Sequence, residues 1–563
     1  MKDKLFAFVL RHPVWVLLAA LVLVVAAAAG AKNLVFKSDY RVFFSADNPQ
    51  LVAYESMQNI YNKSDNVAFI VVPTGDTVFN QETLNIVGQM TEDAWQIPYS
   101  TRVDSITNFQ HTWAEEDDMI VEDLVPEGQL STDQLARIQA IALNEPLLRS
   151  KLVSEQGHVT VVNVTVQLPG VNPVVEVPEV VAKVREIQQK YMAENPGLDI
   201  KLSGIVMMNN SFAEASLTDN ATLVPAMFGV VIVTMLILLR TFTGTLSTVV
   251  IIAASIAGAM GLAGWGGLFL TGPSASAPTM ILTLAVADCI HILSTMFYEM
   301  RHGVEKKKAL HDSLRINFQP IMLTSVTTAI GFLSMNFSDS PPFRDLGNIV
   351  ATGVMLAFVL SVTLFPALLM LLPVKVRVRH EEERDSMRAL ARFVTSQRTR
   401  LLPLMGVIMI SLVMFLPQNK LNDDFVKYFD TSVPFRQATD FMQDNLSGMT
   451  QLEISVDSGE SSGINDPAYL RTLGDFTTWL RAQPETDHVN TITDTLQRLN
   501  KNMHADNDEY YRLPQDRELS AQYLLLYEMS LPYGLDLNNQ LNVDKSSTRL
   551  IGTFNNMTSN ELV

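Results

Sequence analysis

The sequence of 563 residues is poor in the groups that form cross-links, metal sites and common catalytic sites. Its single cysteine, Cys289, excludes an intrachain disulfide. It has no Gly-x-x-x-x-Gly-Lys-Ser/Thr loop, so the chain itself does not look driven by ATP. Its cysteine and histidine residues do not have the spacing of metal ligands. We therefore expect neither a metal nor a cofactor, and we find no signature of an enzyme.

Charged residues are also scarce. Asp, Glu, Lys and Arg make up only 18% of the chain, whereas apolar residues make up 48%. This balance is typical of a membrane protein that also has sizeable soluble parts. The formal net charge is -18, which argues against nucleic-acid binding as the main task.

Long apolar runs are abundant, by contrast, and seven of them are long enough to span a bilayer. They lie at about 13–30, 222–239, 246–270, 277–298, 318–337, 347–373 and 401–417. The first run could instead belong to a signal peptide. Its length favours a retained helix, because a cleaved signal usually has a shorter apolar core.

Basic residues in the short connections predict the orientation. If all seven runs span, these residues fall on one side, and loops rich in Lys and Arg face the cytoplasm. They are Lys2, Lys4 and Arg11; Arg240; Arg301, Lys306, Lys307, Lys308 and Arg315; and Lys375, Arg377, Arg379, Arg384, Arg388, Arg392, Arg398 and Arg400. The N-terminus is then cytoplasmic, and two long polar stretches, about 31–221 and 418–563, lie outside. The first of these has 12 Lys/Arg and 26 Asp/Glu, which fits that side.

The first outer stretch has the pattern of an α+β domain. We predict strands at 66–75, 102–109, 158–168 and 199–205, and helices at 80–96 and 178–197. Two β-α-β units of this kind suggest a ferredoxin-like pair of layers. The sequence thus predicts a polytopic α-helical membrane protein with about seven spanning helices and two α+β, ferredoxin-like outer domains.

The connector at 380–400 has one apolar helical face, made by Met387, Leu390, Phe393 and Val394. Glutamates lie at its start and arginines at its end, which suits the helix dipole. We expect this helix to lie along the inner membrane surface, with a solvated linker helix as the alternative.

The chain also repeats itself. SDYRVFF (38–44) resembles DDFVKYF (423–429), and VDSIT (103–107) resembles VNTIT (489–493). Met57 and Gln58 correspond to Met442 and Gln443, a shift of 385 residues. Such a repeat implies duplicated membrane architecture. We therefore expect this chain to be the N-terminal portion of a twelve-helix protein, with a genuine half-transporter as the alternative.

The segment PIMLTSVTTAIGFLSMNFSDSPPFRDLGNIVATGVMLAFVLSVTLFPALLMLLP (320–373) resembles the fifth and sixth helices of the MMPL-like, sterol-sensing-domain branch of the RND transporter superfamily. That branch usually carries Gly-x-x-x-Asp-Tyr in its fourth helix. The matching positions here are Leu284, Asp288 and Cys289, so the aspartate is kept and its two companions are not.

The resemblance implies a bacterial inner-membrane secondary transporter that uses protons to export lipid-like or other hydrophobic or amphiphilic molecules. It further implies periplasmic outer domains, a homo-oligomer (dimer or trimer) and a periplasmic partner. The expected parts are a first span at 1–30, a porter-like domain at 31–221, five spans at 222–373, an amphipathic cytoplasmic linker at 374–400, a seventh span at 401–417, and an incomplete second periplasmic domain at 418–563. A lipid-binding or lipid-sensing membrane protein and a SecDF-like accessory of protein export are the alternatives.

Asp288 and His291 are the candidate proton relay. A charge near the centre of a span costs on the order of 3 kcal/mol, so such residues face the bundle or a water-filled cavity. His291 is three residues further on and shares a helical face with Asp288, and histidine is the common side chain whose unperturbed pKa is about 6.5. Hydroxyls that could support the relay belong to Thr324, Ser325, Thr327 and Thr328. The alternatives are a structural carboxylate at Asp288, a histidine near the inner interface, and hydroxyls that serve helix packing.

Overall fold

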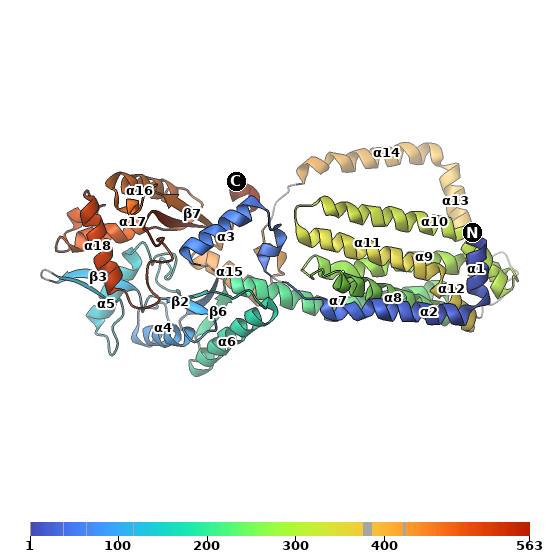
Figure 1. The fold of residues 1–563 in the computed structure, drawn as a ribbon, viewed down its shortest axis with the longest axis horizontal. Helices are drawn as coiled ribbons and strands as arrows, with labels where there is room; N and C mark the ends of the chain where they lie inside the picture. The colour runs from blue at the N-terminus through green and yellow to red at the C-terminus, as the bar shows by residue number, and fades with distance from the viewer. Residues whose placement is uncertain are drawn as a thin grey trace. The chain divides into compact units, whose positions relative to one another are not determined.

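The computed structural model describes residues 2–37, 39–62, 65–115, 118–374, 386–419 and 424–562 (Figure 1). The chain divides into two compact units. Unit 1 comprises residues 1–45 and 212–421, and unit 2 comprises residues 46–211 and 422–563. Each unit therefore combines segments that are far apart in the sequence.

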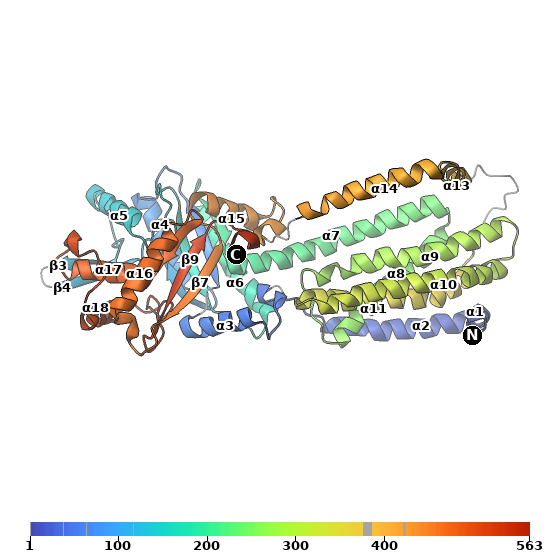
Figure 2. The same cartoon turned by 90° about the horizontal axis from the view of Figure 1, so that it is seen from above.

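Unit 1 is helical. Its helices are α1 (Lys2–Arg11), α2 (Pro13–Ala28), most of α7 (Ile205–Leu239), α8 (Phe242–Trp265), α9 (Ala277–Arg301), α10 (Lys306–Leu333), α11 (Pro341–Val362), α12 (Leu364–Leu371), α13 (Ser386–Ser396) and α14 (Arg398–Met414). Figure 2 shows α8, α9, α10 and α11 running alongside one another. Part of the predicted connector, residues 375–385, lies outside the described residues.

Seven helical stretches in the described part of the chain are long and apolar enough to cross a membrane. They are Pro13–Asn33, Ile205–Leu239, Phe242–Trp265, Ser274–Arg301, Lys306–Phe337, Pro341–Leu371 and Arg398–Gln418. Each coincides with one of the seven predicted runs, so the predicted number of candidate membrane-spanning helices is confirmed. The second stretch begins well before residue 222, because the first turns of α7 are helical but polar.

Helices α8, α9 and α11 form the centre of unit 1. About half of the residues in their most apolar stretches are buried, whereas no residue is buried in the corresponding stretch of α14. Small residues let α8 approach its neighbours closely. A Cβ at Gly261 would overlap the carbonyl oxygen of Ala27 in α2, and one at Gly258 would overlap Leu356 in α11. These glycines permit backbone contact in the way expected of membrane helices.

Unit 2 contains a four-stranded antiparallel sheet. Its strands are β1 (Asn66–Val72), β2 (Ser100–Asp104), β5 (Thr160–Val166) and β6 (Asp199–Ser203), in the order β2-β5-β1-β6. Helix α4 (Gln81–Ala94) connects β1 to β2, and α6 (Pro173–Glu194) connects β5 to β6. Each crossover passes over one strand, and the two helices pack against each other. Helix α3 (Pro49–Tyr61) precedes the sheet, and a hairpin of β3 (Gln110–Glu115) and β4 (Asp118–Asp123) with α5 (Thr132–Asn144) lies between β2 and β5.

A second sheet in unit 2 has three described strands, β7 (Thr450–Asp457), β8 (Thr486–Asn490) and β9 (Ser547–Phe554), in the order β7-β9-β8. Both pairings are antiparallel. The helices of this segment are α15 (Pro434–Asn445), α16 (Pro467–Arg481), α17 (Ile492–Asn502), α18 (Arg517–Ser530) and α19 (Ser559–Leu562). Strands β7, β9 and β8 lie side by side in the same arrangement as β1, β5 and β2 of the first sheet. The two sheets therefore have the same topology over these three strands.

The repeat that the sequence suggests extends to the helices. Shifted by 385 residues, the bounds of α1, α2, α3 and α4 fall within one or two residues of those of α13, α14, α15 and α16. Strand β1 likewise falls on β7, and β2 on β8. The structure therefore carries the duplication in both units.

Candidate functional site in the helix bundle

Helix α9 carries the candidate carboxyl group. It begins at Ala277 with a proline in its first turn, and it ends before His302 and Gly303, whose φ of 85° stops the helix. Asp288 lies near its middle and is only 6% exposed. Its neighbours on the buried face of α9 include Ala285 and Cys289, which are fully buried. A polar group thus sits inside an apolar helix contact.

Ser325 of α10 is the polar neighbour of Asp288. Its Oγ donates a hydrogen bond of 3.3 Å to Asp288 Oδ2, and Ser325 itself is only 3% exposed. Within the described ranges, no lysine, arginine or histidine forms an ion pair with Asp288. A carboxylate that is buried with one neutral donor and no counter-charge is costly to keep ionised. The site is therefore suited to hold a proton and to release it.

His291 is not brought into contact with Asp288. The imidazole is exposed, and in the described part of the chain its ring nitrogens make no hydrogen bond to the carboxyl group. His291 instead lies on an exposed face of α9 with Thr283, Ala287 and Ser294, and its backbone carbonyl accepts a hydrogen bond from Ser294 Oγ. The structure therefore places the two members of the predicted relay one turn apart on neighbouring faces of one helix.

Among the four predicted hydroxyls, the structure brings Ser325 to Asp288 and places the others elsewhere. Thr324 Oγ1 donates to the carbonyl of Ile321 at 2.9 Å, and Thr327 Oγ1 donates to that of Leu323 at 2.8 Å. Both side chains are exposed and bond to their own helix. Thr328 is half-buried, and its hydroxyl makes no hydrogen bond within the described ranges.

Sequence reasoning missed a second polar contact between α9 and α10. Asn317 Nδ2 donates to Thr295 Oγ1 at 2.9 Å, and Ser313 Oγ donates to the carbonyl of Ile292 at 2.7 Å. The sequence feature that could have revealed this contact is an asparagine, with a serine four residues earlier, just before the apolar run of α10. These bonds lie further along α9 than Asp288 and hold the two helices that carry the carboxyl group and its donor.

A comparison of this chain with models of known protein families shows the family to which it belongs. The model of the MMPL family matches residues 44–401, which is more than half of the chain and includes Asp288 and Ser325. The chain belongs to the MMPL family. Members of this family are RND-type transporters rather than enzymes, which supports the expectation that this MMPL protein is not an enzyme.

One curated relative shares part of this MMPL chain. The protein MJ1562 of Methanocaldococcus jannaschii, whose name describes it as a membrane protein, is 25% identical over 179 residues. The matched part covers 31% of this chain and 45% of the relative, so the chain spans less than half of that relative's length in the match. Together with the seven apolar helices, this likeness agrees with a multi-pass membrane protein.

Proposed function

We propose that this MMPL protein is a secondary transporter of the inner membrane, in which proton binding at Asp288 drives the export of lipid-like or other amphiphilic molecules. The observation that carries the proposal is a buried carboxyl group with a single neutral donor, inside a candidate membrane span of a chain from a transporter family. Intramembrane ionisable groups of this kind are functional more often than structural.

The mechanism follows from the two charge states of Asp288. The carboxylate accepts the hydrogen bond of Ser325, whereas the protonated group has lost its charge and gains a donor of its own. Each state therefore favours a different contact between α9 and α10, and alternate proton binding shifts the population of two helix arrangements. In this proposal His291, one turn away and exposed, passes the proton between water and Asp288.

The proposal places unit 2 in the periplasm, because the basic connections between the spans belong on the cytoplasmic side. It also assigns both sheets of unit 2 to ferredoxin-like layers. The order β2-β5-β1-β6, with two crossovers that each pass over one strand, supports that assignment for the first sheet. The order β7-β9-β8 supports it for the second.

The test is a transport assay in the native host with the protein as its gene encodes it. Asp288→Asn removes the titratable group at nearly constant volume and should abolish gradient-dependent export while the protein still inserts and folds. Asp219→Asn is the matched control, since Asp219 lies on the exposed side of another candidate span. Normal export by a folded Asp288→Asn variant would refute the proposal.

The same variants separate the alternative functions. Saturable lipid binding that is independent of pH and of Asp288 would indicate a lipid-sensing protein. A secretion defect with normal envelope lipids would indicate an accessory of protein export. Altered envelope lipids together with loss of proton dependence would support the transporter.

A further inference from the structure

Two short amphipathic helices, α1 and α13, lie at the same end of unit 1 (Figure 1). Each directly precedes a candidate membrane span, since α1 leads into α2 and α13 leads into α14. If all seven candidate spans cross the membrane, the first and the seventh begin on the same side of it. Both short helices therefore lie where spans enter the bilayer, on one side of the membrane.

A break in the backbone turns each short helix away from the span that follows it. His12, with φ of -126° and ψ of 52°, separates α1 from α2, and Pro13 comes next. Gln397, with φ of -101° and ψ of 13°, separates α13 from α14. Figure 1 shows both short helices running across the direction of the candidate spans. An amphipathic helix in that orientation at the end of a span lies along the membrane surface.

The repeat of 385 residues shows which side chains of the two helices stay uncovered. In α1, Phe6 is fully buried where the helix packs against α10 and α12, whereas Leu5 and Phe8 are 41% and 56% exposed. Their counterparts in α13, Leu390 and Phe393, are 54% and 55% exposed. Because Leu5 and Phe8 stay exposed although α1 is packed onto the bundle, an exposed apolar pair is a feature of both copies.

Exposed basic side chains flank both apolar pairs. They are Lys2, Lys4 and Arg11 beside the first pair, and Arg398 and Arg400 beside the second. Residues 2–12 contain one acidic residue, Asp3, and residues 389–400 contain none. Large apolar side chains beside Lys and Arg are typical of interfacial helices. The apolar groups enter the boundary of the acyl layer, and the basic groups meet anionic head groups.

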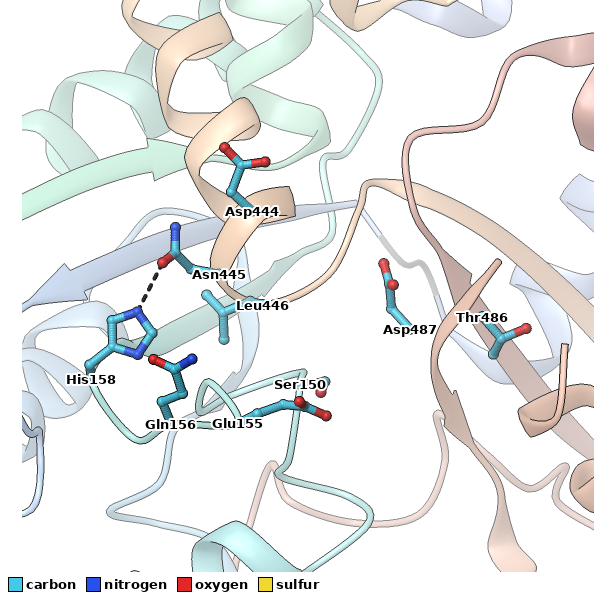
Figure 3. A pocket seen from close by; sticks show the side chains of 9 residues that line it. All are labelled: Ser150, Glu155, Gln156, His158, Asp444, Asn445, Leu446, Thr486 and Asp487. Atoms are coloured by element: carbon cyan, nitrogen blue, oxygen red, sulfur yellow. Dashed lines mark hydrogen bonds between the residues drawn. The ribbon is translucent and has the colours of Figure 1, made fainter. Parts of the chain in front are cut away.

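The surface of unit 2 includes a region of the opposite charge. Figure 3 shows a polar depression with His158 and Asn445 in its wall, where Nε2 and Oδ1 are 2.9 Å apart. The described residues that line it include Glu155, Asp444 and Asp487 but no lysine or arginine. Such a surface repels anionic head groups. Charge complementarity to an anionic lipid therefore distinguishes α1 and α13 from this depression.

We propose that α1 and α13 together form a docking surface for anionic phospholipids, where the first and seventh candidate spans begin. Leu5, Phe8, Leu390 and Phe393 enter the edge of the acyl layer, and the flanking Lys and Arg side chains bind the lipid phosphates. The occupant is the lipid surface rather than another protein, because both helices run along that surface and carry the charge that it attracts. The inference requires that the spans cross the membrane, and it is independent of the proposed transport function.

Quenching of a fluorescent label by lipids tests both parts of the proposal. The full chain, with Cys289→Ala to remove the native thiol, is labelled at Phe8→Cys, Phe393→Cys or Thr395→Cys. Thr395 is the control, because its counterpart in α1, Leu10, is buried against the bundle. The labelled protein is reconstituted in vesicles of phosphatidylcholine and phosphatidylglycerol in equal amounts. Bromine on the acyl chains of one lipid at a time quenches a label that touches that lipid.

We expect the brominated lipids to quench the labels at Phe8 and Phe393 at least about twofold more than the label at Thr395, because only the first two enter the acyl layer. Brominated phosphatidylglycerol should quench the Phe393 label about two- to fivefold more than brominated phosphatidylcholine, since one basic residue near an anionic surface favours binding by about fivefold. High salt should remove this preference. Arg398→Gln combined with Arg400→Gln should also remove most of it.

Arg471→Gln is the matched control for the arginine changes, because Arg471 is exposed on α16 of unit 2, and it should leave the preference intact. Equal quenching at Phe393 and Thr395, or equal quenching by the two brominated lipids at low salt, would overturn the proposal. A Phe393 label that neither brominated lipid nor aqueous iodide reaches would overturn it too, since a protein surface would then cover α13. Asp288→Asn should leave the quenching unchanged, so this result is separate from a failure of transport.

Discussion

At the scale of single residues, Ser325 determines how the carboxyl group of Asp288 is held. It supplies the protein hydrogen bond to that group, so Ser325→Ala should slow gradient-dependent transport about tenfold, as expected for a hydrogen bond to a charged group. Ser325→Thr keeps the hydroxyl and should retain most of the rate. Ser334→Ala is the control, because Ser334 Oγ bonds to the carbonyl of Gly331 in its own helix. Equal losses in Ser325→Ala and Ser334→Ala would contradict this role.

His488 should make unit 2 sensitive to acid. Burial lowers the pKa of His488 to about 3, and Nε2 lies 2.8 Å from the carbonyl oxygen of Pro146, to which it donates. Below the unfolded pKa of about 6.5 the unfolded chain binds the proton and the folded chain does not. The contribution of neutral His488 to the free energy of unfolding is thus fully present above pH 6.5. It is lost as the pH falls towards 3, by at most about 1.4 kcal/mol per pH unit.

Thermal unfolding between pH 7.5 and 4.5 measures this effect. His488→Gln keeps a donor for Pro146 but cannot titrate, so its melting temperature should fall less steeply with pH than that of the wild type. His111, whose pKa burial lowers to about 4, should supply the remaining slope. Identical slopes in the variant and the wild type would exclude His488 as the sensor.

The sequence predicted the burial of Asp288, and physical reasons explain why it did not predict the surroundings of that residue. Helix periodicity and the cost of a buried charge predict that Asp288 turns inward, and it does. The same periodicity places His291 within one turn of Asp288. Only the packing of other helices against α9 decides which of its faces are buried, and His291 lies on an exposed face. Likewise, only the packing of α10 against α9 selects Ser325 from the four candidate hydroxyls between residues 324 and 328.

At the scale of elements, the contact between α2 and α8 depends on the absence of a side chain. A Cβ at Gly261 would collide with the backbone of Ala27 and Ala28. Gly261→Ala should therefore destabilise the bundle by about 1–3 kcal/mol through overpacking. Gly229→Ala in α7 should be neutral or slightly stabilising, because outside the backbone of α7 itself the described residues place no atom within 4 Å of the added carbon. Thermal unfolding in detergent measures both, and equal melting temperatures would contradict the close contact.

Element boundaries show where sequence patterns stop being informative. Hydropathy predicted each apolar helix, but it missed the polar first turns of α7 because composition does not reveal a helix that leaves the membrane. The strand predicted at 102–109 ends at Asp104. There Asn108 Oδ1 accepts from the backbone N–H of Ser105, and this turn replaces the sheet pairing. The repeat, by contrast, is visible in the structure, where α15 and β7 are the counterparts of α3 and β1.

At the scale of the whole molecule, the two segments of unit 2 depend on each other. Arg498 of α17 pairs with Glu145, after α5, at 2.9 Å, and their side chains are only 6% and 10% exposed. Glu145→Ala would leave the arginine buried and unpaired, which typically costs about 3–5 kcal/mol. The exposed pair Arg517–Glu460 is the control, and Glu460→Ala should cost less than about 1 kcal/mol.

Denaturant unfolding followed by fluorescence measures both changes. If Glu145→Ala and Glu460→Ala proved equally mild, the two segments would not be joined through this buried pair. The predicted difference instead means that residues 46–211 and 422–562 unfold together. Unit 2 then behaves as one folding unit.

The central claim is that Asp288 couples proton movement to transport, and proton flux tests it most directly. The purified protein is reconstituted in liposomes with a pH-sensitive dye inside, and a pH gradient is imposed with and without an amphiphile that has no titratable group. The account predicts amphiphile-stimulated proton flux in the wild type and in Asp219→Asn, and none in Asp288→Asn. Stimulated flux that persists in a folded Asp288→Asn variant would contradict it.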